Sequence, residues 1–279
     1  MEEKEIMALR RIACRLRKDA VGMVYRAKTG HAAPALSIAD IMATLYFKEM
    51  RIKPENPKWP ERDVFILSKG HASPIYYATL AERGYFPREW LETYRTLDTK
   101  LHGHPVLNKV PGVDMTTGSL GNGLSVGVGK ALSARRHKRN NMVYVILGDG
   151  EIQEGLVWES AMFAGNQRLG SVVAILDNNG LQSGGNTSEI MNLEPLDKKW
   201  EAFGWHVQRI DGHDISALHD AVVAAKEEKD KPSLIIADTV KGKGVSFMEG
   251  KYLWHMKAPT DAEYKQAMSE LEKEEARYV

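Results

Sequence analysis

Apolar side chains recur at three- and four-residue steps through the first 28 residues, with Arg and Lys between them. This spacing places the apolar side chains on one face and predicts a single amphipathic helix. A loop marked by Gly and Pro follows at 29–34, and a second helical pattern runs from Ser37 to about Glu49. Ser37 and Asp40 are a candidate N-cap pair for that second helix.

From residue 63 onward the pattern changes to short, continuously apolar segments that alternate with helical patterns. Such an alternation is typical of a parallel sheet that is covered by helices on both faces. The five predicted strands are 63–68, 142–147, 171–176, 205–210 and 233–238. Between them we expect a helix of small residues at 118–136 and a polar, Gly-rich loop at 183–195. The prediction is one α/β domain spanning 1–279, with helical additions at its N-terminal end and at its C-terminal end, 261–278.

Charge and composition exclude several classes of partner. The 279 residues include 38 Lys and Arg against 37 Asp and Glu, a net charge of +1 without sustained basic runs, so binding to nucleic acid or to an anionic membrane is not expected. The single cysteine, Cys14, excludes an intramolecular disulfide and fits a reducing compartment. The apolar runs are far shorter than a membrane span, and the N-terminus is acidic where a signal peptide is basic. We expect a cytoplasmic protein, with an enzyme as the leading class.

Two polar motifs follow neighbouring predicted strands. Gly148-Asp149-Gly150 comes after one strand and Asn178-Asn179 after the next, with 27 residues between Gly150 and Asn178. In a parallel sheet the carboxyl ends of the strands lie at one edge, so Asp149 and Asn179 should converge there. Their oxygens suit Mg²⁺ or Ca²⁺, and the glycines allow backbone N–H groups to approach a diphosphate. Gly-Asp-Gly alone is a common turn; the second polar pair favours a ligand site.

Four histidines stand beside Gly, Ala or Pro in predicted loops: His31, His71, His104 and His255. A lone histidine is more often structural, but four in such contexts favour the lining of a polar pocket. Their spacing lacks the paired pattern of a zinc site. His102 is ambiguous, and the remaining four are predicted to be surface or packing residues: His137, His206, His213 and His219.

These motifs together resemble a known family. Gly148–Gly150 with Asn178-Asn179 resembles the thiamine diphosphate motif, and five further stretches resemble transketolase: TGHAAP (29–34), LSKGH (67–71), GHP (103–105), PGVDMTTGSLGNG (111–123) and TVKGKG (239–244). The similarity extends from about Arg10 to Lys265. It implies the diphosphate-binding domain of the thiamine-diphosphate-binding fold. It also implies a metal, Mg²⁺ with Ca²⁺ or Mn²⁺ as alternatives, held by Asp149, Asn179 and the carbonyl of Leu181.

The resemblance also assigns contacts to the cofactor. His71 and His255 resemble the histidines that contact the cofactor diphosphate, and Gly150 resembles the residue that offers a backbone amide there. Gly118 and Leu120 resemble the contacts near the aminopyrimidine ring. Asn179, as a metal ligand, belongs to the same cofactor site.

On the substrate side, His31 and His104 resemble the residues that bind sugar hydroxyls near the reacting carbon. Glu154 and Glu159 match two acids that form a proton path between paired active sites. Without the resemblance, Glu154 is simply a first-turn helix acid and Glu159 a surface acid, because carboxylates near a helix N-terminus are stabilised without any catalytic role.

Full transketolases have three domains, and this chain resembles the first one alone. The resemblance therefore implies the N-terminal subunit of a split transketolase, in an α₂β₂ assembly with a C-terminal subunit that carries the pyrimidine-binding and final domains. Its expected reaction moves a two-carbon ketol unit from a ketose or ketose phosphate to an aldose or aldose phosphate, as in the pentose phosphate pathway.

Three positions depart from the family pattern: Ser183 and Gly184 replace a hydrophobic residue and an Asp, and Met256 replaces a Gly. They leave the donor open. The alternatives are a specialised sugar transketolase, an α-type component of a 2-oxoacid dehydrogenase, and a non-catalytic module that only binds diphosphate. The histidine motifs at 29–34 and 103–105 argue against the dehydrogenase type. The full histidine set with Glu154 and Glu159 argues against the non-catalytic module.

Overall fold

The core of the molecule is a five-stranded parallel sheet with the strand order β1-β2-β3-β7-β6. It is seen in a computed structural model that describes residues 1–278. The strands are β1 Val64–Leu67, β2 Val143–Gly148, β3 Val172–Asn178, β6 His206–Asp211 and β7 Ser233–Asp238. Each lies within two residues of its predicted bounds. The predicted α/β fold with a parallel sheet is confirmed.

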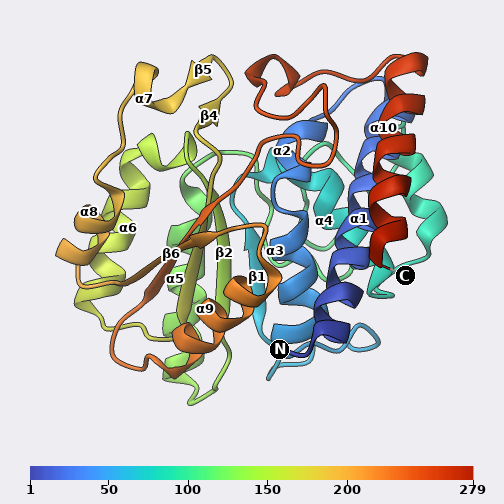
Figure 1. The fold of residues 1–279 in the computed structure, drawn as a ribbon. Coiled ribbons are helices and arrows are strands. Elements are labelled where there is room, and N and C mark those ends of the chain that lie inside the picture. Colours follow the sequence, from blue (N-terminus) through green and yellow to red (C-terminus); the bar gives the residue numbers. More distant parts are fainter. Residues whose placement is uncertain (279) are drawn as a thin grey trace.

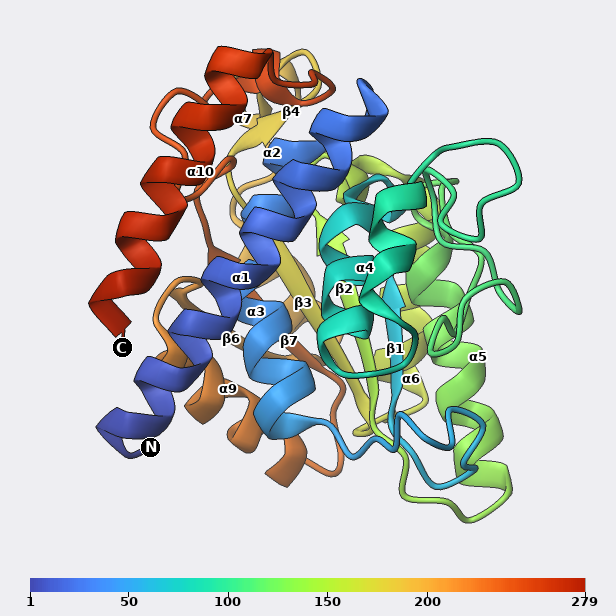
Figure 2. The same ribbon diagram turned by 90° about the vertical axis from the view of Figure 1, so that its right-hand side faces the viewer.

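Helices cover both faces of this sheet, as Figures 1 and 2 show. One layer contains α1 Glu3–Ala27, α2 Ala32–Leu36, α3 Ala39–Thr44, α4 Ser73–Glu82 and α9 Ile215–Glu227. The other layer contains α5 Asn122–Arg136, α6 Gly155–Asn166 and α8 Leu196–Ala202. Along β2, Tyr144 and Ile146 pack into the first layer, whereas Val143, Val145 and Leu147 pack into the second. Side chains of a strand alternate between faces, so a strand buried on both faces is apolar throughout.

The two ends of the chain lie side by side. Helix α10, Asp261–Glu275, runs along α1 on the outer side of the first layer (Figures 1 and 2). The rings of Tyr25 and Tyr264 stack with centroids 4.0 Å apart, and Glu275 accepts from both Arg15 and Lys18. Among residues 1–278, no helix has the length and apolar character needed to cross a membrane.

The segment after α1 differs from the prediction. Helix α2 begins at Ala32 inside the predicted loop, and the predicted second helix is divided into α3 and a π-helical turn, Leu45–Glu49. Ser37 is not an N-cap, because its hydroxyl donates to Pro34 O at 3.1 Å and to Asp177 Oδ2 at 2.8 Å. A buried carboxylate needs donors, and that need outweighs the local capping preference.

Two other boundaries also differ. The predicted helix at 118–136 begins at Asn122, so that 118–121 remain as a loop. The predicted loop at 183–195 overlaps a small antiparallel pair, β4 Leu181–Gln182 with β5 Gly185–Asn186, followed by α7 Thr187–Ile190. Strands of two residues are too short for an alternating pattern to be visible in the sequence.

Candidate active site

The two polar motifs meet at one edge of the sheet. Strands β2 and β3 are parallel neighbours with Gly148 opposite Asp177, so Asp149 and Asn179 follow them at the same end. A cavity of about 370 Å³ opens there. The predicted site residues that line it are His31, His71, Gly118, Leu120, Asp149, Gly150, Glu154, Asn179, Leu181 and His255. The expected convergence of these loops at the sheet edge is therefore present.

Asp149 is the carboxylate at the centre of the predicted metal set. It is 3% exposed, and its Oδ1 accepts from the Gly150 N–H at 2.8 Å. Its Oδ2 is buried and has no hydrogen-bond partner among the described residues. Burial, reinforced by the neighbouring Asp177, raises the pKa of Asp149 to about 6. An unpaired buried carboxylate oxygen fits a cation, because a buried charge needs a partner.

The other two predicted metal ligands lie beside Asp149 in the cavity wall. The Asn179 Nδ2 donates to Asp177 Oδ2 at 3.0 Å, and its Oδ1 accepts from the Leu181 N–H at 3.2 Å. Within 1–278 there is no metal-holding group of three or more His, Cys, Asp or Glu side chains. The predicted set contains one carboxylate, one amide oxygen and one backbone carbonyl, so the metal stays a prediction that rests on this mixed set of oxygens.

Three histidines form a compact group on one wall of the cavity. The ring centroids of His31, His71 and His255 are 5.1–5.3 Å apart in all three pairs. Burial lowers the pKa of His31 to about 4 and that of His255 to about 3, and it holds the pKa of His71 well below its ordinary value. The rings are therefore neutral at neutral pH. The Nδ1 atoms of His31 and His255 are buried without partners among the described residues, which leaves them free for a ligand.

His104 approaches the cavity from the 95–121 loop. Gly118, at φ 140°, is so close that a Cβ atom there would lie 3.2 Å from His104 Cγ. The Tyr77 hydroxyl fixes the loop by donating to the carbonyls of His102 and His104. The structure thus brings His104 next to the cavity but not into its lining.

The two predicted proton-path acids lie in different places. Glu154 lines the cavity at the N-cap position of α6, and its side chain is exposed. Glu159 is exposed on α6 and does not line the cavity. Their joint role stays a prediction.

A buried ion pair at the bottom of the cavity was not predicted. Lys69, 2% exposed, places its Nζ 2.5 Å from Asp177 Oδ2 and donates to Pro34 O at 2.8 Å. Asp177 also accepts from Thr239, in addition to Ser37 and Asn179. The signal in the sequence is a Lys two residues after the apolar strand β1, and an Asp inside the apolar strand β3.

Lys241 is a second buried cation in the cavity wall. It is 2% exposed, and its Nζ donates to the carbonyl oxygen of Leu181 at 3.0 Å. Burial, together with the nearby charge of Lys69, lowers the pKa of Lys241 to about 8. Because Asp177 neutralises Lys69, Lys241 is the lysine of this cavity wall that can attract an anion, and an anionic group such as a diphosphate would in turn stabilise its charged form.

Glu151 forms hydrogen bonds to three of the segments that surround the cavity. Its carboxylate accepts from Ser68 Oγ, from the Gly121 N–H at 3.0 Å and from the Gly148 N–H at 3.0 Å. These bonds join the ends of β1 and β2 to the loop before α5. Glu151 is a supporting residue that the sequence did not single out.

One of the three departures from the family pattern lines this cavity, whereas Gly184 and Met256 are not among its lining residues. Ser183 lines it, and beside it Gln153 Nε2 donates to Gln182 Oε1 at 2.6 Å. Met256 is 63% exposed next to His255. Polar side chains therefore occupy part of the wall where the family places a hydrophobic residue.

Comparison with known proteins decides the family. Residues 9–278 match the family model described as transketolase, thiamine diphosphate binding domain. The chain belongs to the transketolase family. It is 49% identical over 261 residues to the 6-deoxy-6-sulfo-D-fructose transketolase subunit SqwG of Clostridium sp. (strain MSTE9), covering 94% of this chain and 95% of that protein. It is 44% identical to one of the subunits of the apulose-4-phosphate transketolase of Actinobacillus succinogenes, with 88% of each chain covered.

Full-length transketolases match over part of their length. The human transketolase is 40% identical over 92% of this chain but 41% of its own length. The crystal structure of the Campylobacter jejuni transketolase matches with a TM-score of 0.91 at 30% identity, covering all of this chain and 46% of that one. The chain thus spans nearly all of the subunit relatives and about half of the full-length transketolases. The prediction of an N-terminal, transketolase-type enzyme subunit with the thiamine-diphosphate-binding fold is confirmed.

Proposed function

We propose that this chain is one half of a two-chain transketolase that moves a two-carbon ketol unit from a ketose to an aldose. The observation that carries the proposal is the cavity at the β2–β3 edge, in which an unpaired carboxylate, two lysines and three neutral histidines converge. The coverage of the relatives supports the division into two chains, because the subunit relatives match nearly end to end.

Asp149, Asn179 and the Leu181 carbonyl would hold a divalent cation, with Mg²⁺ first and Ca²⁺ or Mn²⁺ as alternatives. Asp149 Oδ2 has no other partner among the described residues, which supports this assignment. The Leu181 carbonyl accepts from Lys241, and the Gly150 amide donates to Asp149 Oδ1. When a cation is bound, the Leu181 carbonyl would either release Lys241 or accept from it while also binding the cation. The same holds for Asp149 Oδ1 and the Gly150 amide.

The cofactor's anionic end fits the charges of this cavity. Thiamine diphosphate, when bound, supplies the carbanion chemistry. His71, His255 and Lys241 would bind its diphosphate, while Gly118 and Leu120 would contact the aminopyrimidine. His31 and His104 would orient the sugar, since a neutral imidazole both donates and accepts hydrogen bonds and therefore matches hydroxyl groups.

The partner would complete the site from the side of α5 and α6. These helices expose Val126, Met162 and Phe163, whose side chains are 36–55% exposed, and Glu159 lies among them on α6. We assign this face to the C-terminal subunit or to the paired half of an α₂β₂ assembly, where Glu154 and Glu159 would form the proton path. An exposed cluster of large apolar side chains is typical of an interaction site.

There are two candidate classes of ketose donor. A ketose phosphate is the expectation from the family as a whole, and a specialised sugar is the second candidate. The specialised subunits are 43–49% identical to this chain, whereas the full-length transketolases are 40–41% identical. This difference favours a specialised ketose with an anionic terminal group.

The test is reconstitution. The purified chain would be assayed for ketol transfer alone and with a second chain that carries the pyrimidine-binding domain, against ketose phosphates and 6-deoxy-6-sulfofructose. We expect activity in the mixture and none from either chain by itself. Turnover by this chain alone would overturn the two-chain proposal. Binding of the cofactor by a reconstituted but inactive mixture would favour the non-catalytic module, and decarboxylation of a 2-oxoacid would favour the dehydrogenase type.

A further inference from the structure

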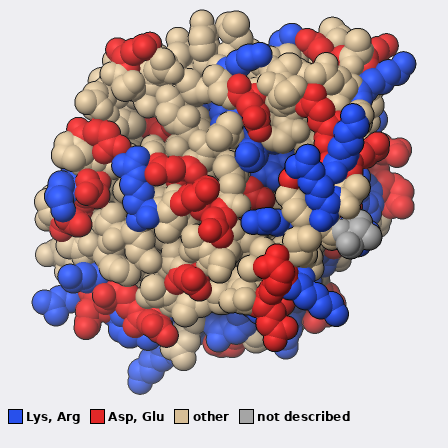
Figure 3. Space-filling view, in the orientation of Figure 1, with Lys and Arg blue, Asp and Glu red and all other residues tan. Residues whose placement is uncertain are grey.

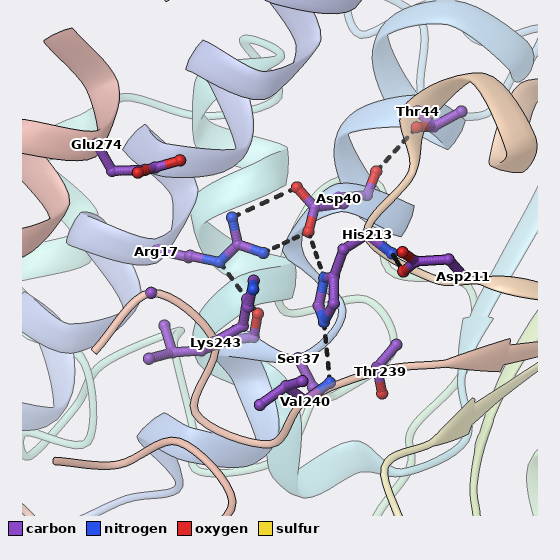
Figure 4. Close-up of polar contacts among 12 residues, drawn as sticks. Arg17, Ser37, Asp40, Thr44, Asp211, His213, Thr239, Val240, Lys243 and Glu274 are labelled. Carbon is purple, nitrogen blue, oxygen red and sulfur yellow. Dashed lines mark hydrogen bonds and ion pairs between the residues drawn. The ribbon is translucent and has the colours of Figure 1, made fainter. Parts of the chain in front are cut away.

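We call the cavity at the β2–β3 edge, to which the proposed function assigns the cofactor, the cofactor cavity. A buried polar cluster lies outside it, where α1, α3 and the β6–α9 loop meet (Figure 4). Arg17 Nη2 lies 2.5 Å from Asp40 Oδ2, and both residues are 5% exposed. Burial opposes ionisation of Asp40, but the Arg17 guanidinium and the hydrogen bond with His213 together outweigh it and lower the pKa of the carboxyl to about 2. Asp40 is therefore a fixed anion in the interior of the first helical layer.

His213 connects this anion to the backbone after β7. Its Nδ1 lies 2.7 Å from Asp40 Oδ2, and its Nε2 accepts from the Val240 N–H at 2.9 Å (Figure 4). Since Nε2 accepts a hydrogen bond, the proton of the neutral ring resides on Nδ1 and is donated to Asp40. The carboxylate thus selects the tautomer that can hold Val240, as the partner of a ligating histidine does in metal sites.

Val240 stands between Thr239, which bonds to the cavity residue Asp177, and Lys241, which lines the cavity. The hydroxyl of Thr239 donates to Asp177, and Lys241 Nζ donates to the Leu181 carbonyl. The Gly242 N–H then donates to Ala33 O at 3.0 Å. The segment 239–242 is therefore anchored on its cavity side by side chains and on its opposite side by His213.

The loop that carries His213 is packed directly against this segment. The Gly212 N–H donates to Asp238 O at 2.8 Å, and a Cβ atom on Gly212 would lie 2.5 Å from Thr239 Cγ2. The close approach of the two backbones leaves little freedom for the imidazole. His213 is thus held by its own loop as well as by Asp40.

We infer that His213 is a positioning residue, whose bond to the Val240 N–H fixes segment 239–242 and thereby places Lys241 in the cofactor cavity. The inference rests on the proposed function, because Lys241 is there assigned to the diphosphate. Without the imidazole, the Val240 N–H loses its acceptor and the backbone next to a buried lysine is free to move. Loss of comparable supporting contacts in metal sites lowers affinity by about 10- to 100-fold.

The surroundings of His213 make this role measurable by exchange. His213 forms part of the wall of a second cavity of about 600 Å³, which is lined by α1, α10 and residues 243–249. On the face in Figure 3, basic side chains gather beside α10 and are interspersed with acidic ones. Loss of the bond to His213 would therefore expose the Val240 amide to solvent from this side.

Two variants separate the two bonds of the imidazole. His213→Asn keeps a donor for Asp40 at the Nδ1 position but is too short to reach the Val240 N–H. His213→Gln is long enough to donate to Asp40 and to accept from Val240 together. His219→Asn is the matched control, because His219 Nδ1 lies 2.5 Å from Glu49 Oε1 in a similar histidine–carboxylate pair that does not contact segment 239–242.

Each full-length variant would be studied by amide hydrogen exchange and by calorimetric titration with Mg²⁺ and pyrophosphate. We expect H213N to exchange faster at 239–242 and to bind pyrophosphate about 10-fold more weakly. We expect H213Q and H219N to resemble the wild type in both measurements. Slow amide hydrogen exchange in β3 and β7 shows that the variant is folded. If H213N loses this slow exchange, His213→Met, which fills a similar volume without the acceptor, takes its place.

Wild-type exchange at 239–242 in H213N would overturn the inference, and so would weaker binding without faster exchange. The proposed function fails in a different way, namely if the wild-type chain binds no pyrophosphate with Mg²⁺. In that case faster exchange confined to 239–242 still supports the positioning role, and unchanged exchange still rejects it.

Discussion

The ammonium of Lys69 lies 2.5 Å from Oδ2 of Asp177 beneath the cofactor cavity, with 3% and 0% of the two side chains exposed. The pair joins the end of β1 to the end of β3. Burial opposes ionisation of Asp177, but Lys69 and the hydrogen bonds from Thr239 and Ser37 together outweigh it and lower the pKa of the carboxyl. The floor of the cavity therefore depends on two charges that neutralise each other away from water.

Replacing Lys69 by Met should strongly destabilise the fold. Asp177 would remain buried without its counter-ion, which typically lowers the free energy of unfolding by roughly 3–5 kcal/mol. Urea denaturation measures this change. The control is Lys198→Met, which removes the exposed pair with Glu201 and should leave the free energy of unfolding nearly unchanged. Equal stabilities of the two variants would contradict a structural role for the Lys69–Asp177 pair.

A methyl group at Gly118 should also be unfavourable. Gly118 has φ 140°, and an added Cβ would lie 3.2 Å from the His104 ring. Backbone strain of this kind costs about 1–3 kcal/mol, so Gly118→Ala should unfold at lower urea concentration. Gly129→Ala is the matched control, because nothing lies within 4 Å of its added Cβ in helix α5. It should stabilise the helix by up to about 1 kcal/mol. A similar loss in both variants would show that the strain at Gly118 is not the cause.

The buried histidines predict that the stability of the fold depends on pH. His31 and His255 have pKa values of about 4 and about 3 in the folded chain, and both titrate near 6.5 when exposed. Between those values the unfolded chain binds more protons. The free energy of unfolding should therefore fall as the pH is lowered from about 6.5 to about 4. Asp149, whose pKa is raised to about 6, acts in the opposite direction below that pH.

Urea unfolding at several pH values measures how the free energy of unfolding depends on pH. Comparing the wild type with a variant that lacks the two histidines gives their share of that dependence. The double variant H31N/H255N should show a shallower dependence on pH than the wild type over this range. His137→Asn, at the end of α5 and outside the cavity, should leave the dependence unchanged. An unchanged slope in the double variant would mean that these rings are protonated equally well in the folded and unfolded chains.

The lowered pKa of Lys241 predicts that the chain binds anions more weakly at high pH. The pKa is lowered to about 8, so Lys241 loses its positive charge above that pH in the ligand-free chain. Affinity for pyrophosphate with Mg²⁺ should therefore decline as the pH rises through about 8. Lys241→Met should bind roughly 10- to 100-fold more weakly at neutral pH, the loss of one charge-assisted contact, and should not show the decline. Lys243→Met, which removes a half-buried lysine outside the cofactor cavity, should behave as the wild type does.

The sequence was sufficient for the sheet and for the position of the cavity. Strands buried on both faces are apolar throughout, and the length of chain between Gly150 and Asn178 accommodates one helix and one return strand. Because strand ends in a parallel sheet share an edge, the convergence of Asp149 with Asn179 could be predicted without coordinates.

The supporting residues could not be predicted in the same way. Lys69, Asp177 and Lys241 are of types that are rarely buried, and burial is revealed only by partners from other strands. His213 was interpreted as a surface or packing residue. Its partner Asp40 is 173 positions away and Val240 is 27 positions away, so no local pattern connects them.

The central claim is that Asp149 holds a divalent cation that binds the diphosphate, and calorimetric titration of the full chain with pyrophosphate tests it directly. Wild-type chain should bind pyrophosphate when Mg²⁺ is present and lose that binding when Mg²⁺ is chelated. Asp149→Ala should not bind under either condition, whereas Asp197→Asn, which changes an exposed side chain on α8 outside the cavity lining, should bind as the wild type does. Mg²⁺-dependent binding of undiminished affinity in Asp149→Ala would contradict the account.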